Sequence, residues 1–205
     1  MRFCNSGGYM WQQRCLKTTI SIMLVFSFGI ANLAFSAPQT HIGASSYSIS
    51  GQSSLILSAE MDAKGPLGDD GRRHPAKTKW DLQWRFKQTE INAQCGVDSV
   101  QVSLGITHIK PVWRDRTEAS QALIDRWEVF EAALNTIQKH HVDLAMKAAS
   151  EIEETVLNVT PQKTCEELET MVGSIVRNIK EKYRALKTEY ESSTNYGRRA
   201  GLSLM

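Results

Sequence analysis

Residues 117–156, TEASQALIDRWEVFEAALNTIQKHHVDLAMKAASEIEETV, predict one long amphipathic helix. Apolar side chains recur here at steps of three and four residues, which places them on one face of a helix. His141 fills the single gap in this apolar stripe, and we interpret it either as a buried residue with a hydrogen-bond partner or as the remnant of a metal site. The apolar members of the stripe are Leu123, Trp127, Phe130, Leu134, Ile137, Leu144, Ala148 and Ile152.

The composition is that of a globular protein. The chain has 205 residues, of which 41% are hydrophobic and 22% charged, which predicts one domain or at most two. The formal net charge of +2 becomes −1 when Arg2, Arg14 and Lys17 are left out, and the first 36 residues contain no acidic residue. A near-neutral remainder argues against a polyanionic partner, so we expect no nucleic acid to bind.

Residues 1–36 have the pattern of an export signal. Basic residues ending at Lys17 precede an apolar run over 20–34, and Ala34 and Ser36 provide the small side chains that a signal peptidase requires. The run is shorter than the roughly 20 residues of a membrane-spanning helix, which favours cleavage before Ala37 over retention as a signal anchor. We therefore predict a periplasmic or secreted protein with no membrane span after signal cleavage.

Cys95 and Cys165 are the two cysteines that remain once the signal, with Cys4 and Cys15, is removed. Two cysteines in an oxidising compartment most simply form one disulfide. The alternative is a pair of buried thiols. A zinc finger is not indicated, because no second pair of metal ligands accompanies them.

Between the export signal and the long helix, the residue pattern predicts mainly strands. Residues 37–46 are expected to form a flexible lead-in, and residues 47–50 a short strand. Alternating apolar and polar residues over 80–86 and 100–108 predict two long, half-buried strands that pair antiparallel around a turn at 92–96.

Shorter signals complete this part of the chain. Ser53 or Ser54 is expected to cap a short helix that ends at Met61. Residues 64–77 are dense in glycine, proline and aspartate and predict an exposed loop. Pro111 is expected to end the second long strand, and Thr117 or Ser120 to begin the long helix. The inward side chains expected in the short helix are Leu55, Ile56 and Ala59.

A second long helix follows Thr160 and Pro161. Thr164 and Glu167 have the spacing of a capping box at its start. The whole pattern predicts an α+β fold, with a small antiparallel sheet packed on a long helical hairpin in a single domain over 47–205. The inward residues expected in the last helix are Leu168, Val172, Ile175, Ile179, Leu186 and Tyr190.

Over most of residues 47–202 the sequence resembles a bacterial family of predicted secreted zinc-dependent proteases, which implies a minimal zincin-like fold. The order and spacing of short motifs carry the resemblance. They are Gly65-Pro66, Thr78-Lys79-Trp80, Cys95 with Val97, Pro111 before Trp113, Trp127, Cys165 and Thr194-Asn195-Tyr196-Gly197.

The resemblance also implies where a zinc site would lie. The family carries His-Glu-x-x-His on the long helix and Thr-x-His-Gly in the tail. Two histidines four residues apart on a helix can bind one zinc ion, and the glutamate activates the attacking water. The helix motif falls here on Ile137-Gln138-Lys139-His140-His141, and Tyr196 takes the position of the tail histidine. Of the motif positions, His141 alone holds a metal ligand of the family's kind.

Three hypotheses follow for the function. The first is an exported, metalloprotease-like protein that has lost its metal site and binds a peptide or an envelope protein, with no cofactor. The second is an active zinc-dependent protease with a rearranged ligand set that includes His141. The third is a purely structural envelope protein.

Overall fold

The computed structural model describes residues 38–204, so the predicted export signal over 1–36 lies outside the described residues. The described chain has an α+β fold, as predicted. No helix in this part of the chain combines the length and the hydrophobicity that crossing a membrane requires. The elements are β1 (Gln39–Ile49), α1 (Ser54–Lys64), β2 (Lys77–Ile91), β3 (Gln94–Trp113), α2 (Gln121–Leu157) and α3 (Cys165–Ser193), with short 3-10 helices at Arg116–Glu118 and Arg198–Ala200.

The predicted antiparallel hairpin is confirmed as β2 and β3. Trp80 lies opposite Ile106 and Trp84 opposite Val102, so the apolar sides of the two strands face the same way. The turn is tighter than predicted, because β3 already begins at Gln94.

The sheet as a whole is mixed, which corrects the prediction of an antiparallel sheet. β1 pairs parallel with β3, and the strand order is β1-β3-β2. The strand predicted over 47–50 is present but begins eight residues earlier, since β1 runs through Gln39–Ile49, and the flexible lead-in expected over 37–46 is therefore wrong from Gln39 on. Its first residues are mostly small or polar and show no alternation, but backbone hydrogen bonds to β3 need no apolar side chains.

Pro111 does not end β3, which continues to Trp113. The last pair between β2 and β3 joins Lys77 to Ile109, so among the described strands β3 pairs from there on with β1 alone. Proline is tolerated in a strand where one side makes no ladder hydrogen bonds.

The short helix α1 begins as predicted but turns a different face inward. The hydroxyl of Ser53 accepts a hydrogen bond from the Ile56 N–H at 3.3 Å, which caps the helix. Leu57 and Met61 are its buried residues. The expected inward residues Leu55, Ile56 and Ala59 are exposed instead.

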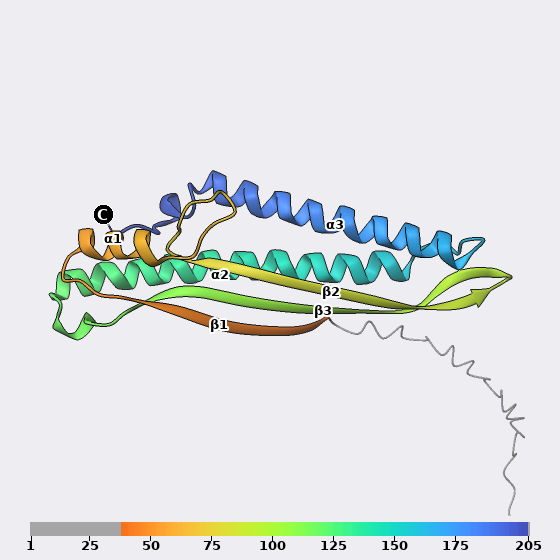
Figure 1. Ribbon diagram of the computed structural model, residues 1–205, viewed down its shortest axis with the longest axis horizontal. Helices are drawn as coiled ribbons and strands as arrows, with labels where there is room; N and C mark the ends of the chain where they lie inside the picture. The colour runs from red at the N-terminus through yellow and green to blue at the C-terminus, as the bar shows by residue number, and fades with distance from the viewer. Residues whose placement is uncertain (1–37, 205) are drawn as a thin grey trace, which may run out of the picture. The chain divides into compact units, whose positions relative to one another are not determined.

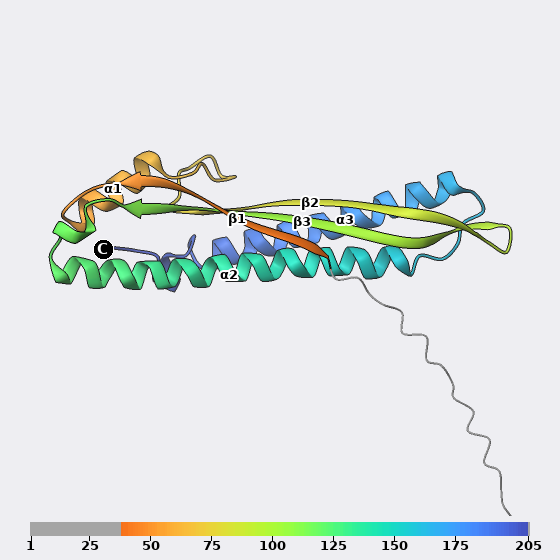
Figure 2. The same ribbon diagram turned by 90° about the horizontal axis from the view of Figure 1, so that it is seen from below.

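Helices α2 and α3 form the predicted hairpin, and both run along the sheet (Figures 1 and 2). Ser120 is the N-cap of α2, whereas Thr117 lies in the preceding 3-10 helix. Every residue of the predicted stripe, His141 included, is buried.

Helix α3 is capped by Thr164, whose hydroxyl accepts the Glu167 N–H at 3.1 Å. Leu186 was placed on the inward face but is 38% exposed. Ile175 and Tyr190 are half-buried against the core, whereas Val176 and Tyr183, which the prediction did not include, are buried. The buried residues of α3 are Leu168, Val172, Val176, Ile179 and Tyr183.

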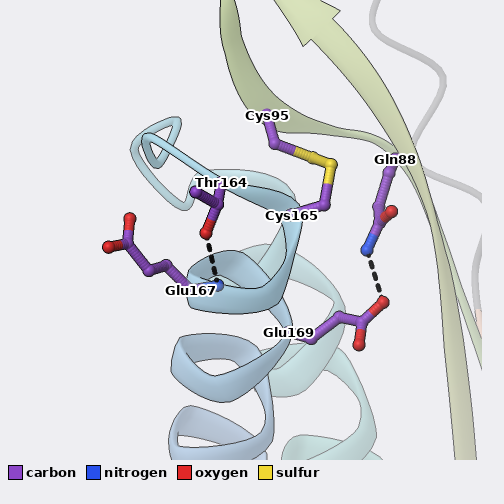
Figure 3. The surroundings of a disulfide bond; sticks show 6 residues. All are labelled: Gln88, Cys95, Thr164, Cys165, Glu167 and Glu169. Carbon is purple, nitrogen blue, oxygen red and sulfur yellow. Dashed lines mark hydrogen bonds between the residues drawn. A yellow bond between two sulfur atoms is a disulfide. The ribbon is translucent and has the colours of Figure 1, made fainter.

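The predicted disulfide joins Cys95, near the start of β3, to Cys165, the first residue of α3 (Figure 3). The same junction is held by two backbone hydrogen bonds of 2.8 Å between Cys95 and Gln162. The side chain of Gln88 donates to Glu169 at 2.8 Å across the same end of the sheet. The hairpin turn of the sheet and the connection between the helices are therefore fixed to each other.

Two apolar clusters lie along α2, and they meet at His141. The first joins the C-terminal half of α2 to β3 and α3. The second joins its N-terminal half to Ile49, Trp113 and the tail residues Leu202 and Leu204. The polar gap in the helical stripe thus marks the boundary between the two parts of the core.

Candidate functional site

A cavity of about 360 Å³ lies at this boundary. Its walls come from the middle of α2, the last turns of α3, the loop that precedes β2 and the turn that follows α3. The lining residues that carry the argument below are Asp69, Asp70, His74, Lys77, Ile137, Gln138, His141, Lys187, Glu191 and Tyr196.

Gln138 and His141 bring two buried polar groups to the cavity. Gln138 is 8% exposed and His141 is 6% exposed. Neither the Gln138 Nε2 nor the His141 Nε2 has a hydrogen-bond partner in the described part of the chain. The interpretation of His141 as a hydrogen-bonded core residue therefore fails for this nitrogen, whose closest carboxylate oxygen is Glu191 Oε1 at 3.8 Å. An unpaired buried polar group costs about 1–3 kcal/mol, so such groups call for an explanation.

Burial lowers the pKa of His141 to about 4, and the positive charges of Lys187, His140 and His108 contribute in the same direction. His141 is therefore neutral in the folded protein near neutral pH.

Because His141 stays neutral in the folded protein, the free energy of unfolding should depend on pH. The unfolded chain takes up a proton at His141 as the pH falls below about 6.5, while the folded chain does not do so until about pH 4. The free energy of unfolding should thus fall by about 3 kcal/mol between these pH values because of this residue alone. Urea unfolding of the wild type and of His141→Gln across this range measures the effect, since the variant should lack this part of the pH dependence. A difference between the two proteins that stays constant with pH would contradict the assignment.

Tyr196 packs against the loop over 64–77. Its ring stacks on His74 with centroids 4.6 Å apart, and the guanidinium of Arg72 lies 5.7 Å from the ring centre. His74 Nε2 is 2.9 Å from Asp70 Oδ1. The hydrogen bond to His74, followed by the one from the Arg72 N–H, holds the pKa of Asp70 well below its usual range. These contacts tie the loop, which had been predicted only as exposed, to the wall of the cavity.

The turn after α3 contains the tail motif over 194–197, and its geometry accounts for the threonine and the glycine of that motif. The Thr194 hydroxyl donates to the Tyr190 carbonyl at 2.8 Å and accepts the Gly197 N–H at 3.1 Å. Tyr196 has a φ of 53°, which is uncommon for an aromatic residue, and Gly197 has a φ of 84°. A Cβ atom at Gly197 would lie 2.5 Å from Ile137 Cδ1, so the turn approaches α2 at the first position of the helix motif.

The structure thus brings all four predicted motif positions, Ile137, Gln138, His141 and Tyr196, to one cavity. Several further polar residues of the cavity carry no functional prediction from the sequence, among them Asp70, His74, Lys187 and Glu191. The weak signal that could have found His74 and Asp70 is the turn-rich segment over 64–77. Lys187 and Glu191 carry no local signal, because they lie on a charged helix face.

The residues at this site do not fit a zinc ion. Ile137 has no ligand atom, and Gln138 has no carboxylate. Catalytic zinc sites use three protein ligands and an open position. Within residues 38–204 no group of three or more His, Cys, Asp and Glu side chains is placed to hold a metal ion.

Comparison with known proteins identifies the family. The family model described as "Bacterial protein of unknown function (DUF922)" matches residues 44–197, and the chain belongs to this family. Neither the curated proteins nor the solved structures gave a match.

Proposed function

We propose that this protein is an exported, metalloprotease-like protein that binds a peptide segment of a partner in its cavity without cleaving it. One observation carries the proposal. Three positions that match the protease motifs line a single cavity, but they hold Ile137, Gln138 and Tyr196 in place of two zinc ligands and a general base. The positions of the protease motifs thus share one cavity, but that cavity lacks the groups that zinc-dependent proteolysis would use.

The chemistry of the cavity suits a peptide. The unpaired Gln138 Nε2 can donate to a carbonyl oxygen of a ligand. The unpaired His141 Nε2 can donate to a carbonyl oxygen or accept a backbone N–H, according to its tautomer, and either bond would offset the cost of burial. Leu134 and Ile137 line the same cavity and provide apolar contact for a side chain. Cavities with apolar walls and a few polar groups are the usual form of binding sites.

Export is supported by two independent features. The first is the signal pattern over 1–36. The second is the disulfide between Cys95 and Cys165, which is compatible with an oxidising compartment.

Metal analysis and a binding assay test the proposal together. The purified protein should contain far less than one zinc ion per chain, and a bound peptide should be recovered intact. Zinc at one ion per chain that is lost in His141→Ala would overturn the proposal in favour of the rearranged protease.

Gln138→Leu separates binding from stability. The substitution removes an unpaired buried amide, so the free energy of unfolding should stay the same or rise by about 1 kcal/mol, while capture of peptides from a random library should fall. Asn135→Leu, an equivalent change on the exposed face of α2, is the control and should leave capture unchanged. If Gln138→Leu left capture unchanged, the cavity would not be the binding site.

A further inference from the structure

A groove continues from the cavity between β2 and α3. Two further hollows, of about 450 and 310 Å³, follow one another along α3. The first shares Asp69, Lys77, Thr78 and Lys187 with the cavity, and the second shares Lys180 and Arg184 with the first. On this side β2 pairs with no other strand in the described part of the chain. We call the two hollows together the β2–α3 groove.

The β2–α3 groove is basic although the chain after the signal is close to neutral. Its lining includes six basic side chains and three acidic ones. Four of the basic residues lie on α3 at steps of three and four residues. This spacing places their side chains in a stripe along one face of the helix. The stripe consists of Arg177, Lys180, Arg184 and Lys187.

Most of these cations have no carboxylate partner. Arg177, Lys180 and Arg184 form no ion pair with any described residue. Lys180 instead donates to the carbonyl of Leu82 in β2 at 3.4 Å. Clustered cations without counter-charges repel one another, and a bound anionic group would relieve that repulsion.

The groove and the cavity each contain a buried N–H group that has no hydrogen-bond acceptor in the described structure. The indole N–H of Trp80, which lines the groove, has no acceptor in the described structure, just as the Gln138 Nε2 amide in the cavity has none. The combination of unpaired donors and unpaired cations calls for a ligand rich in hydrogen-bond acceptors and negative charge.

Asp69 occupies the wall shared by the cavity and the groove. Its carboxylate is 2.7 Å from Lys77 Nζ and 3.7 Å from Lys187 Nζ, and its side chain is 78% exposed. An acidic side chain therefore already sits between two of the lysines, where a carboxylate from a ligand could replace it.

We propose that the β2–α3 groove binds an extended acidic peptide segment, whose end or side chain enters the cavity. The inference rests on the proposed function and names the chemistry of its partner. A peptide fits better than a nucleic acid, because the outer edge of β2 offers backbone donors and acceptors in alternation, and a peptide backbone complements both. The first 36 residues of this chain contain no acid, so they lack the charge to occupy the groove.

Fluorescence polarisation with two labelled peptides tests the proposal on the full chain. A peptide of alternating Glu and Val should bind, its lysine counterpart should not, and binding should weaken as the ionic strength rises. The double variant Lys180→Gln, Arg184→Gln should weaken binding about fivefold to twentyfold, since each exposed charge pair contributes modestly. Asp69→Asn should tighten binding about threefold, because it releases Lys77 and Lys187.

The control removes the same charge elsewhere. Lys139→Gln, Lys182→Gln changes two lysines that pair with Asp143 and Glu151 outside the groove, and it should leave the affinity within about twofold of the wild type. Equal binding of the two peptides, an equal effect of both double variants, or preferential binding of a single-stranded oligonucleotide would overturn the proposal. A dimer in sedimentation that excludes the acidic peptide would do the same, since a second copy would then fill the groove.

The outcomes separate this inference from the proposed function. If library peptides still bind through Gln138 but show no preference for acidic residues, the acidic partner is wrong and the proposed function stands. If no peptide of any charge binds, both fail.

Discussion

The triple variant Ile137→His, Gln138→Glu, Tyr196→His should bind one zinc ion per chain, whereas the natural sequence should bind none tightly. Positions 137 and 141 are four residues apart on α2, and both face the cavity that position 196 also lines. Gly197 packs directly on Ile137, so the tail already approaches the first ligand position. Three histidines would complete the ligand number that zinc requires, and the glutamate would lie beside the open position.

Zinc content and thermal unfolding measure the result. A bound metal stabilises the folded state by mass action, so the melting temperature of the triple variant should rise with added zinc. A matched variant with Asn135→His in place of Ile137→His carries the same number of histidines but places one on the exposed face of α2, and it should not respond. A triple variant that folds and takes up no zinc would show that the motif positions are wrongly aligned.

Removal of the disulfide by Cys95→Ala with Cys165→Ala should lower the free energy of unfolding by about 4 kcal/mol. The bridge closes a loop across a sequence separation of 70 residues, so its loss releases a large conformational entropy in the unfolded chain. The local backbone contacts between Cys95 and Gln162 would remain, which allows the fold to persist.

Denaturant unfolding with and without a reductant measures this difference. The reduced wild type should match the double variant, and the reductant should have no effect on the variant itself. A wild type that unfolds at the same denaturant concentration in both conditions would contradict a stabilising bridge.

The sequence predicted best those elements whose signal is local. The stripe on α2, the alternation around Trp80 and Ile106 and the caps at Ser53 and Thr164 each follow from neighbouring residues. β1 was largely missed, because its residues have no pattern of their own and its pairing partner lies more than 60 residues further along the chain. Pro111 was misjudged because its tolerance depends on where β2 ends.

In the candidate site too, some residues could be found from the sequence, whereas others depend on contacts between distant parts of the chain. The resemblance selected Ile137, Gln138, His141 and Tyr196, and these line one cavity. The stacking of His74 on Tyr196 and the approach of Glu191 to His141 depend on how a loop and a helix end meet, which no local pattern contains. The unpaired state of the buried nitrogens can be seen only once every neighbour has been placed.

The parallel strand β1 has a consequence for the order in which the protein opens. Of its eleven residues only Ile49 is buried, so the first part of the strand is attached almost entirely by its ladder to β3. Such a segment can detach at a small fraction of the global unfolding energy, as elements with few apolar contacts do. Detachment of β1 would leave backbone N–H and C=O groups of β3 unpaired, and a strand of a neighbouring molecule could pair with them. Self-association under partially unfolding conditions should therefore begin at β3.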